Sequence, residues 1–177
     1  MRKHLEILAG RLAITHRLLL DAAEACTDDD LSWQPGPTSP SIAFHLWHTA
    51  RWADRWAEAV GGAPQRWVRE GLTAKWGFQG ALGAGDTGML PPDDEAADLP
   101  FPRRDQLTTY LRGAYNDLEQ AIGSLDDDSI LEPRDDLLGK QAPLADSLTR
   151  HLAHDNRHLG MVEALRGLRG SHGTATV

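Results

Sequence analysis

The sequence is poor in cysteine and in basic residues, and each shortage excludes a class of protein. Cys26 is the only cysteine among the 177 residues, so no disulfide can form within the chain, which is typical of a reducing compartment. Asp and Glu total 26 against 18 Lys and Arg, which gives a net charge of −8. A protein that binds the nucleic-acid backbone or an anionic membrane surface needs a basic face instead.

Long apolar runs are also missing. No window approaches the roughly 20 apolar residues that a membrane span needs. The first segment, MRKHLEILAG, mixes polar and apolar residues, unlike the continuous apolar stretch of a signal peptide. We therefore expect a cytoplasmic protein that binds neither membranes nor nucleic acid. With 41% hydrophobic and 25% charged residues, the composition is that of a globular domain.

Strand-like alternation is scarce as well, whereas the helical period is strong. Leu5, Leu8 and Leu12, for example, recur at three- and four-residue steps, which line up on one face of a helix. Four segments have this period: residues 3–26, 41–61, 103–125 and 144–169. The sequence thus predicts an all-α four-helix bundle, with a single domain over residues 1–170 and a flexible tail over 171–177.

The connections between these helices are rich in glycine and proline. Before the second helix, Ser39 is the predicted N-cap and Pro40 the first helical residue. Residues 62–102 lack a long period, so we predict a long ordered loop there, with a short helix near 65–74. We expect residues 124–143 to form an irregular connector without strands.

The last predicted helix carries three of the eight histidines within the stretch HLAHDNRH. His154 and His158 are one turn apart on one face, and His151 lies about 60° from His154 on the same side. Met161 and Leu165 continue this face, so we predict that it points toward the core. The opposite side of the helix carries Arg150, Arg157 and Arg166.

Two histidines at this spacing can bind one metal ion through ring nitrogens at about 2.0–2.1 Å. The spacing alone is a weak signal, because such pairs also occur on solvent-exposed faces. Here a second core-facing pair, His45 and His48, lies on the helix predicted at 41–61 and offers a third ligand. Three protein ligands with one open position are typical of a catalytic metal rather than a structural one.

The segments AFHLWHTARWADRW and HLAHDNRHLGMVEALRGL resemble the DinB-like superfamily of four-helix metalloenzymes. The resemblance extends to WQPGPTSPSIAFHLWH and LTTYLRGAYNDLEQAIGSL and so covers most of the chain. It implies that His48, His154 and His158 bind one divalent metal ion, zinc or nickel. His45, three residues before His48, remains the alternative ligand on its helix. The Gly-Gln that follows the last ligand in many family members is absent here.

Relatives of this family transfer a low-molecular-weight thiol, such as mycothiol or bacillithiol, to a small electrophilic substrate. The resemblance implies the same chemistry here, since a bound metal lowers the pKa of a thiol. A metal-bound water would instead make the protein a hydrolase. The alternative is a non-catalytic bundle that binds metal or a small ligand in a stress response. The resemblance also implies a homodimer.

Other residues near the histidines have two interpretations each. His45, His151, Trp52 and Arg55 are candidates for the pocket or for contacts to the metal ligands. Trp52 and Trp56 also fit simple packing, and Arg55 fits either a surface salt bridge or a substrate carboxylate. His16 lies in the apolar stripe of the first helix and is expected to be a satisfied core or rim histidine. We expect Asp155 to be exposed, with contact to a ligand imidazole as the alternative.

Overall fold

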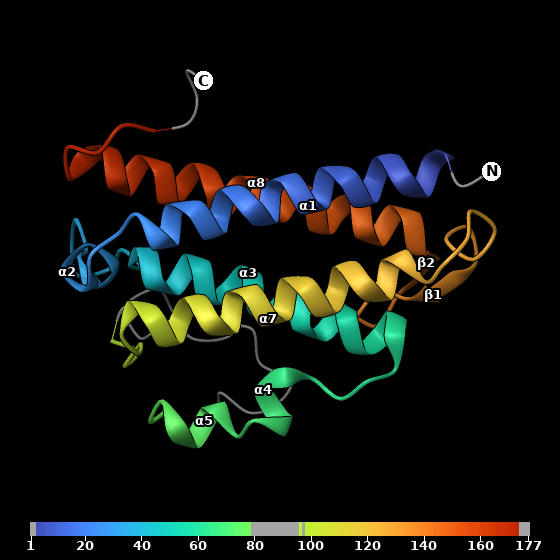
Figure 1. Ribbon diagram of the computed structural model, residues 1–177, viewed down its shortest axis with the longest axis horizontal. Helices are drawn as coiled ribbons and strands as arrows, with labels where there is room; N and C mark the ends of the chain where they lie inside the picture. Colours follow the sequence, from blue (N-terminus) through green and yellow to red (C-terminus); the bar gives the residue numbers. More distant parts are fainter. Residues whose placement is uncertain (1–2, 79–95, 97, 174–177) are drawn as a thin grey trace.

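Four long helices lie alongside one another and form the body of the molecule (Figure 1). The structure is a computed structural model that describes residues 3–78, 96 and 98–173. The long helices are α1 (Lys3–Glu24), α3 (Ile42–Gly61), α7 (Arg104–Gly123) and α8 (Leu144–Leu168). α1 and α3 each pack against both α7 and α8. The predicted all-α bundle is confirmed, and no helix of the described part of the chain is long and apolar enough to cross a membrane.

Helix α3 is the most deeply buried of the four. Every residue from Ile42 to Asp54 is buried, because α7, α8 and the segment after α3 cover different sides of this helix. On the other helices the predicted leucine stripes face inward, as Leu12 and Leu19 on α1 and Leu107 and Leu111 on α7 are fully buried. Polar side chains on α3 are therefore held inside the bundle.

The start of α3 and the end of α1 differ from the prediction. Ser41, not Ser39, is the N-cap of α3, since its hydroxyl accepts a hydrogen bond from the backbone N–H of Phe44 at 3.2 Å. The first helix ends at Glu24, and a separate short helix α2 (Asp28–Ser32) follows. A reciprocal capping box between Thr27 and Asp30 starts α2, which explains why these polar residues do not form a loop.

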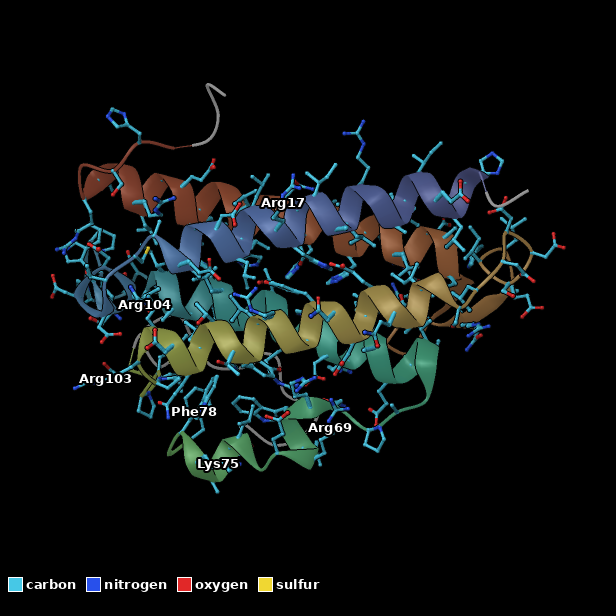
Figure 2. The ribbon with its side chains drawn as sticks, in the orientation of Figure 1. Arg17, Arg69, Lys75, Phe78, Arg103 and Arg104 are labelled. Atoms are coloured by element: carbon cyan, nitrogen blue, oxygen red, sulfur yellow. The ribbon has the colours of Figure 1, made fainter. Side chains whose placement is uncertain are left out.

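The segment after α3 folds back onto the bundle as two short helices, α4 (Arg66–Arg69) and α5 (Leu72–Lys75), in place of the single predicted helix. Gly71 adopts a left-handed conformation between them, with φ of 63°. Phe78 lies between this segment and the bundle, 5.4 Å from the ring of Trp47, whereas Lys75 points outward (Figure 2). The rest of the predicted long loop, 79–95 and 97, lies outside the described residues.

A short hairpin precedes α8, where we predicted no strands. β1 (Pro133–Asp135) pairs antiparallel with β2 (Gln141–Pro143). Between them, the Asp136 carboxylate accepts hydrogen bonds from the backbone N–H groups of Leu138 and Lys140, both at 3.0 Å. The side chain of Asp136 stabilises this turn. The hairpin therefore forms without the alternating apolar pattern that is typical of longer strands.

A buried arginine anchors α4 to α3. Arg51 is fully buried, donates to Asp54 at 3.2 Å and to Gln65 at 3.0 Å, and lies over the ring of Trp67. Asp54 in turn accepts the backbone N–H groups of Arg66 and Trp67 at 2.7 and 2.8 Å. The ion pair thus fixes the start of α4.

Replacing Arg51 with leucine should lower the free energy of unfolding by about 3–5 kcal/mol, because Asp54 would remain as a buried charge without its cation. Chemical denaturation followed by circular dichroism measures this loss. Arg55→Leu is the matched control on the same helix, since Arg55 is only half-buried. Equal unfolding midpoints for Arg51→Leu and the parent protein would contradict the proposed anchor.

Candidate metal centre

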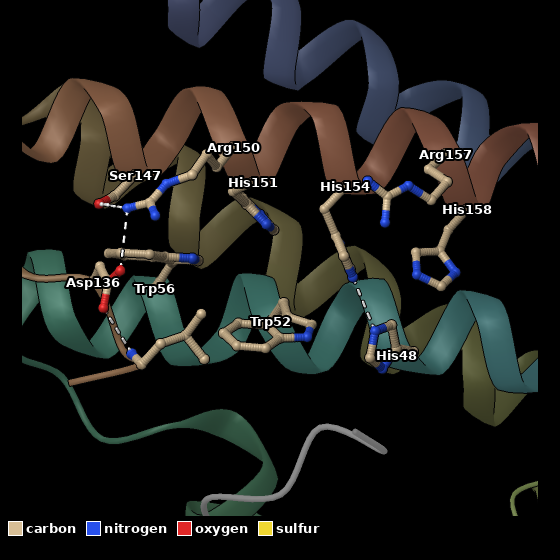
Figure 3. Close-up of a pocket in the computed structure, with 11 residues that line it drawn as sticks. His48, Trp52, Trp56, Asp136, Ser147, Arg150, His151, His154, Arg157 and His158 are labelled. Carbon is tan, nitrogen blue, oxygen red and sulfur yellow. Dashed lines mark hydrogen bonds and ion pairs between the residues drawn. The ribbon is translucent and has the colours of Figure 1, made fainter. Parts of the chain in front are cut away.

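Three imidazoles from two helices converge between α3 and α8. His48 comes from α3, while His154 and His158 come from α8, and one nitrogen of each ring lies within 4.8 Å of the others. The Nε2 atoms of His48 and His154 are 2.9 Å apart (Figure 3). Three nitrogen donors at such distances form a group that could hold one divalent metal ion.

The helices place these rings through simple periodicity. His154 and His158 are separated by four residues, so they stack on one face of α8, with ring centroids 4.4 Å apart. His48 faces them from α3, with its ring centroid 4.7 Å from that of His158. His48 is buried, whereas the two α8 histidines are half-buried. One side of the group therefore remains open.

His45 lies beside this group rather than within it. Its Nδ1 is 3.0 Å from the Nδ1 of His158, so the two rings share a hydrogen bond. A partner on the far nitrogen of an imidazole fixes the orientation of the ring and its tautomer. The structure thus groups His48, and not His45, with His154 and His158, while His45 can orient the ring of His158.

The environment keeps His158 neutral. Burial, followed by the neighbouring imidazoles of His48 and His154, lowers the pKa of His158 to about 2. Metal ions bind the deprotonated form of imidazole, so no proton has to be displaced from this ring at neutral pH.

A cavity of about 340 Å³ opens beside the three histidines (Figure 3). Trp52 and Trp56 of α3 form one wall of this cavity. Both are buried, so these side chains pack in the core and also line the cavity. Arg55 lies over the ring of Trp52 and donates to the carbonyl of Leu137 at 3.3 Å. These two contacts of Arg55 support this wall of the cavity.

Two arginines expected on the opposite side of α8 line the cavity instead. Arg150 donates to the hydroxyl of Ser147 at 3.1 Å and forms an ion pair with Asp136 at 3.2 Å. Arg157 also lines the cavity and is exposed to solvent. The hairpin places Asp136 beside Arg150 near the start of α8. The periodicity of the helix alone could not predict this contact. The cavity therefore combines an apolar wall with cationic groups.

A second cavity, of about 500 Å³, lies on another side of the same histidines. Its lining includes Phe44, His45 and Met161. His48 and His158 line both cavities. The histidine group therefore stands between two openings.

Asp155 was predicted to be exposed, and this prediction is wrong, because the side chain is fully buried. Its Oδ1 accepts a hydrogen bond from the Nδ1 of His154 at 3.1 Å, as the alternative prediction required. Its Oδ2 faces His151 and His16, whose Nε2 atoms lie 3.4 and 3.5 Å away. Helix α8 packs against both α1 and α3, so a larger part of its circumference is buried than one line of apolar residues would predict. Asp155 lies in this buried part.

His16 completes this inner cluster from α1. Its Nδ1 is 2.7 Å from Glu119 of α7, and its ring stacks on Tyr115 at 4.2 Å between centroids. Burial lowers the pKa of His16, but the carboxylates of Asp155 and Glu119 outweigh burial and raise it above the usual value. His151 has the opposite balance: burial lowers its pKa to about 4.

The sequence contained a signal for the inner cluster. His16 interrupts a leucine stripe, and a histidine buried on such a stripe needs a polar partner. His151 and Asp155 are four residues apart, exactly as His154 and His158 are, so α8 carries two interleaved pairs. The prediction considered only pairs of histidines, so it included His154 with His158 and missed His151 with Asp155.

The bundle and its inward-facing histidines define a helical protein with a site fit for a metal ion. The chain belongs to the DinB superfamily, whose family model matches residues 11–162. Among solved structures, it is similar to a conserved protein from Enterococcus faecalis, with a TM-score of 0.78 and 17% identity, over 91% of this chain and 94% of that one. At this identity, the likeness shows the fold alone. A comparison with curated proteins finds no match.

Proposed function

We propose that the protein is a metal-dependent enzyme in which His48, His154 and His158 hold one divalent ion, zinc or nickel. The ion would activate a low-molecular-weight thiol for attack on a small electrophilic substrate. One observation carries the proposal: three imidazole nitrogens from two helices lie within 4.8 Å of one another at the wall of a 340 Å³ cavity. Membership of the DinB superfamily supports a metal-binding role.

A divalent ion at this position supplies Lewis acidity, which lowers the pKa of a thiol or a water molecule. The chain itself orients and encloses the reactants. Trp52 and Trp56 offer an apolar wall that excludes water, and Arg157 offers a cation to an anionic group of a reactant. Cys26 is buried and lines neither cavity next to the histidines, so the thiol must come from a bound small molecule.

A conjugation assay tests this proposal. Protein loaded with zinc or nickel is mixed with chlorodinitrobenzene and one of several thiols: cysteine, glutathione, coenzyme A, mycothiol or bacillithiol. We expect conjugation that requires both the metal and one particular thiol and that stops when a chelator removes the metal. His4→Ala is the matched control, because His4 is an exposed histidine far from the cavity in sequence.

Two results would redirect the proposal. Metal-dependent release of product without any thiol, from an ester or amide substrate, would identify water as the nucleophile and the protein as a hydrolase. Full metal loading with no turnover under any of these conditions would contradict catalysis and favour a non-catalytic metal- or ligand-binding bundle. A homodimer, a cytoplasmic location and a role in stress response stay predictions.

A further inference from the structure

A second group of metal-ligating side chains is buried deeper in the bundle. His16 of α1 and His151 and Asp155 of α8 are at most 4% exposed. One atom from each, namely His16 Nε2, His151 Nε2 and Asp155 Oδ2, has no hydrogen-bond partner within the described part of the chain. One ligand atom of each residue lies within 4.8 Å of the others. Three buried polar atoms without partners thus face one another.

The distances between these atoms are longer than those of ordinary hydrogen bonds between charged groups. Such bonds measure about 2.7–2.9 Å, whereas Asp155 Oδ2 is 3.4 Å from His151 and 3.5 Å from His16. The same His16 ring does form a bond of ordinary length on its other side, 2.7 Å to Glu119. Ligands at about 2.0–2.1 Å from a tetrahedral metal ion are separated by about 3.3–3.4 Å. The two distances from Asp155 are close to this separation, and one ligand atom of each residue lies within 4.8 Å of the others.

The second ring nitrogen of His16 supports the same conclusion. Its Nδ1 bonds Glu119, which leaves Nε2 facing the carboxylate of Asp155, where a metal ion can take the place of a proton. Imidazole ligands of metal ions commonly donate their other N–H to a carboxylate in this way. Glu119 occupies that place for His16, and Asp155 occupies it for His154.

We propose that His16, His151 and Asp155 form a second metal site, which binds a divalent transition-metal ion such as Zn²⁺. Two imidazoles and one carboxylate are donors that suit such an ion. His151 lines the 340 Å³ cavity, so an ion can reach the inner site from there. Asp155 contacts both sites, because its other oxygen bonds His154. The inner site uses residues separate from His48, His154 and His158 and stands independently of the proposed enzymatic function.

Metal counting on the full-length, untagged protein tests the second site. The protein is stripped with a chelator, loaded with Zn²⁺, freed of excess metal and measured by elemental analysis. We expect two equivalents in the parent protein, one in the outer variant His154→Ala/His158→Ala and one in the inner variant His16→Gln/His151→Gln. His4→Gln, a control at an exposed histidine, should retain two.

Loading with Co²⁺ adds a spectroscopic readout of geometry. Tetrahedral Co²⁺ absorbs strongly in the visible range, and its spectrum depends on its ligands. The outer variant should keep the spectrum of a site with two imidazoles and one carboxylate, and the inner variant should keep that of a site with three imidazoles. Circular dichroism confirms that each variant is folded. If the double inner variant does not fold, the single variant His151→Leu replaces it, and we expect its inner equivalent to dissociate at least ten times more readily than in the parent.

The outcomes separate the two sites. Suppose that the parent protein binds one equivalent. If the outer variant loses it and the inner variant keeps it, the second site is overturned and the proposed function is left intact. One equivalent that the inner variant loses and the outer variant keeps would support the second site and overturn the metal assignment of the proposed function. Binding of no Zn²⁺ by the parent protein would overturn both.

Discussion

Replacing both His154 and His158 with alanine should abolish metal binding at the site proposed between α3 and α8. Two of the three nitrogen donors disappear, and His48 alone cannot retain the ion. We expect an affinity loss well beyond about 100-fold, since loss of a mere hydrogen-bonding partner of a ligand already costs about 10–100-fold. Competition with a chromogenic chelator measures the loss, and metal-dependent turnover should vanish with it.

The fold should survive this change, because both histidines are only half-buried at the edge of a cavity. His45→Ala is the informative comparison: it leaves all three donors in place and removes the partner of His158, so we expect the smaller, 10–100-fold loss. An unchanged affinity in the double variant would show that the ion binds elsewhere in the chain.

Replacing Asp155 with asparagine should strongly destabilise the fold. Burial opposes ionisation of this carboxyl group, but His151, His154 and His16 outweigh burial and hold its pKa below the usual range. The ionised carboxylate balances His16, whose raised pKa favours its charged form. Without it, a buried cation would lack this partner, at a cost of about 3–5 kcal/mol in the free energy of unfolding.

Chemical denaturation of the metal-free protein measures this cost. Asn156→Ala is the control, because Asn156 is the exposed neighbour on the same helix. A double variant, Asp155→Asn/His16→Gln, should lose less stability than the sum of its single changes, because the second change removes the unbalanced cation. Strict additivity would argue that the two side chains do not interact.

How much the sequence could predict depended on the range of the contacts involved. The pair His154 and His158 follows from the period of a single helix, and so do the leucine stripes of α1 and α7. The burial of Asp155 depends on how α8 sits between α1 and α3, which no single-helix pattern reveals. The same holds for Arg150, which reaches the cavity through an ion pair with the hairpin residue Asp136.

The wrong predictions about the ends of elements and the hairpin have a different cause. Ser39 and Ser41 both satisfy the composition of an N-cap, and only the geometry of the backbone at Phe44 distinguishes them. The hairpin β1–β2 has three residues in each strand, too few for an alternating pattern to stand out. These differences shift the ends of elements and leave the bundle unchanged.

The two cavities that share His48 and His158 bear on the order in which reactants would bind. Each cavity has its own lining, and the same two imidazoles separate them. In the proposed reaction, a thiol that enters from one side would not block an electrophile that arrives from the other. Such an arrangement favours a ternary complex, in which both reactants are present at once, over an exchange in which the first product must leave before the second reactant enters.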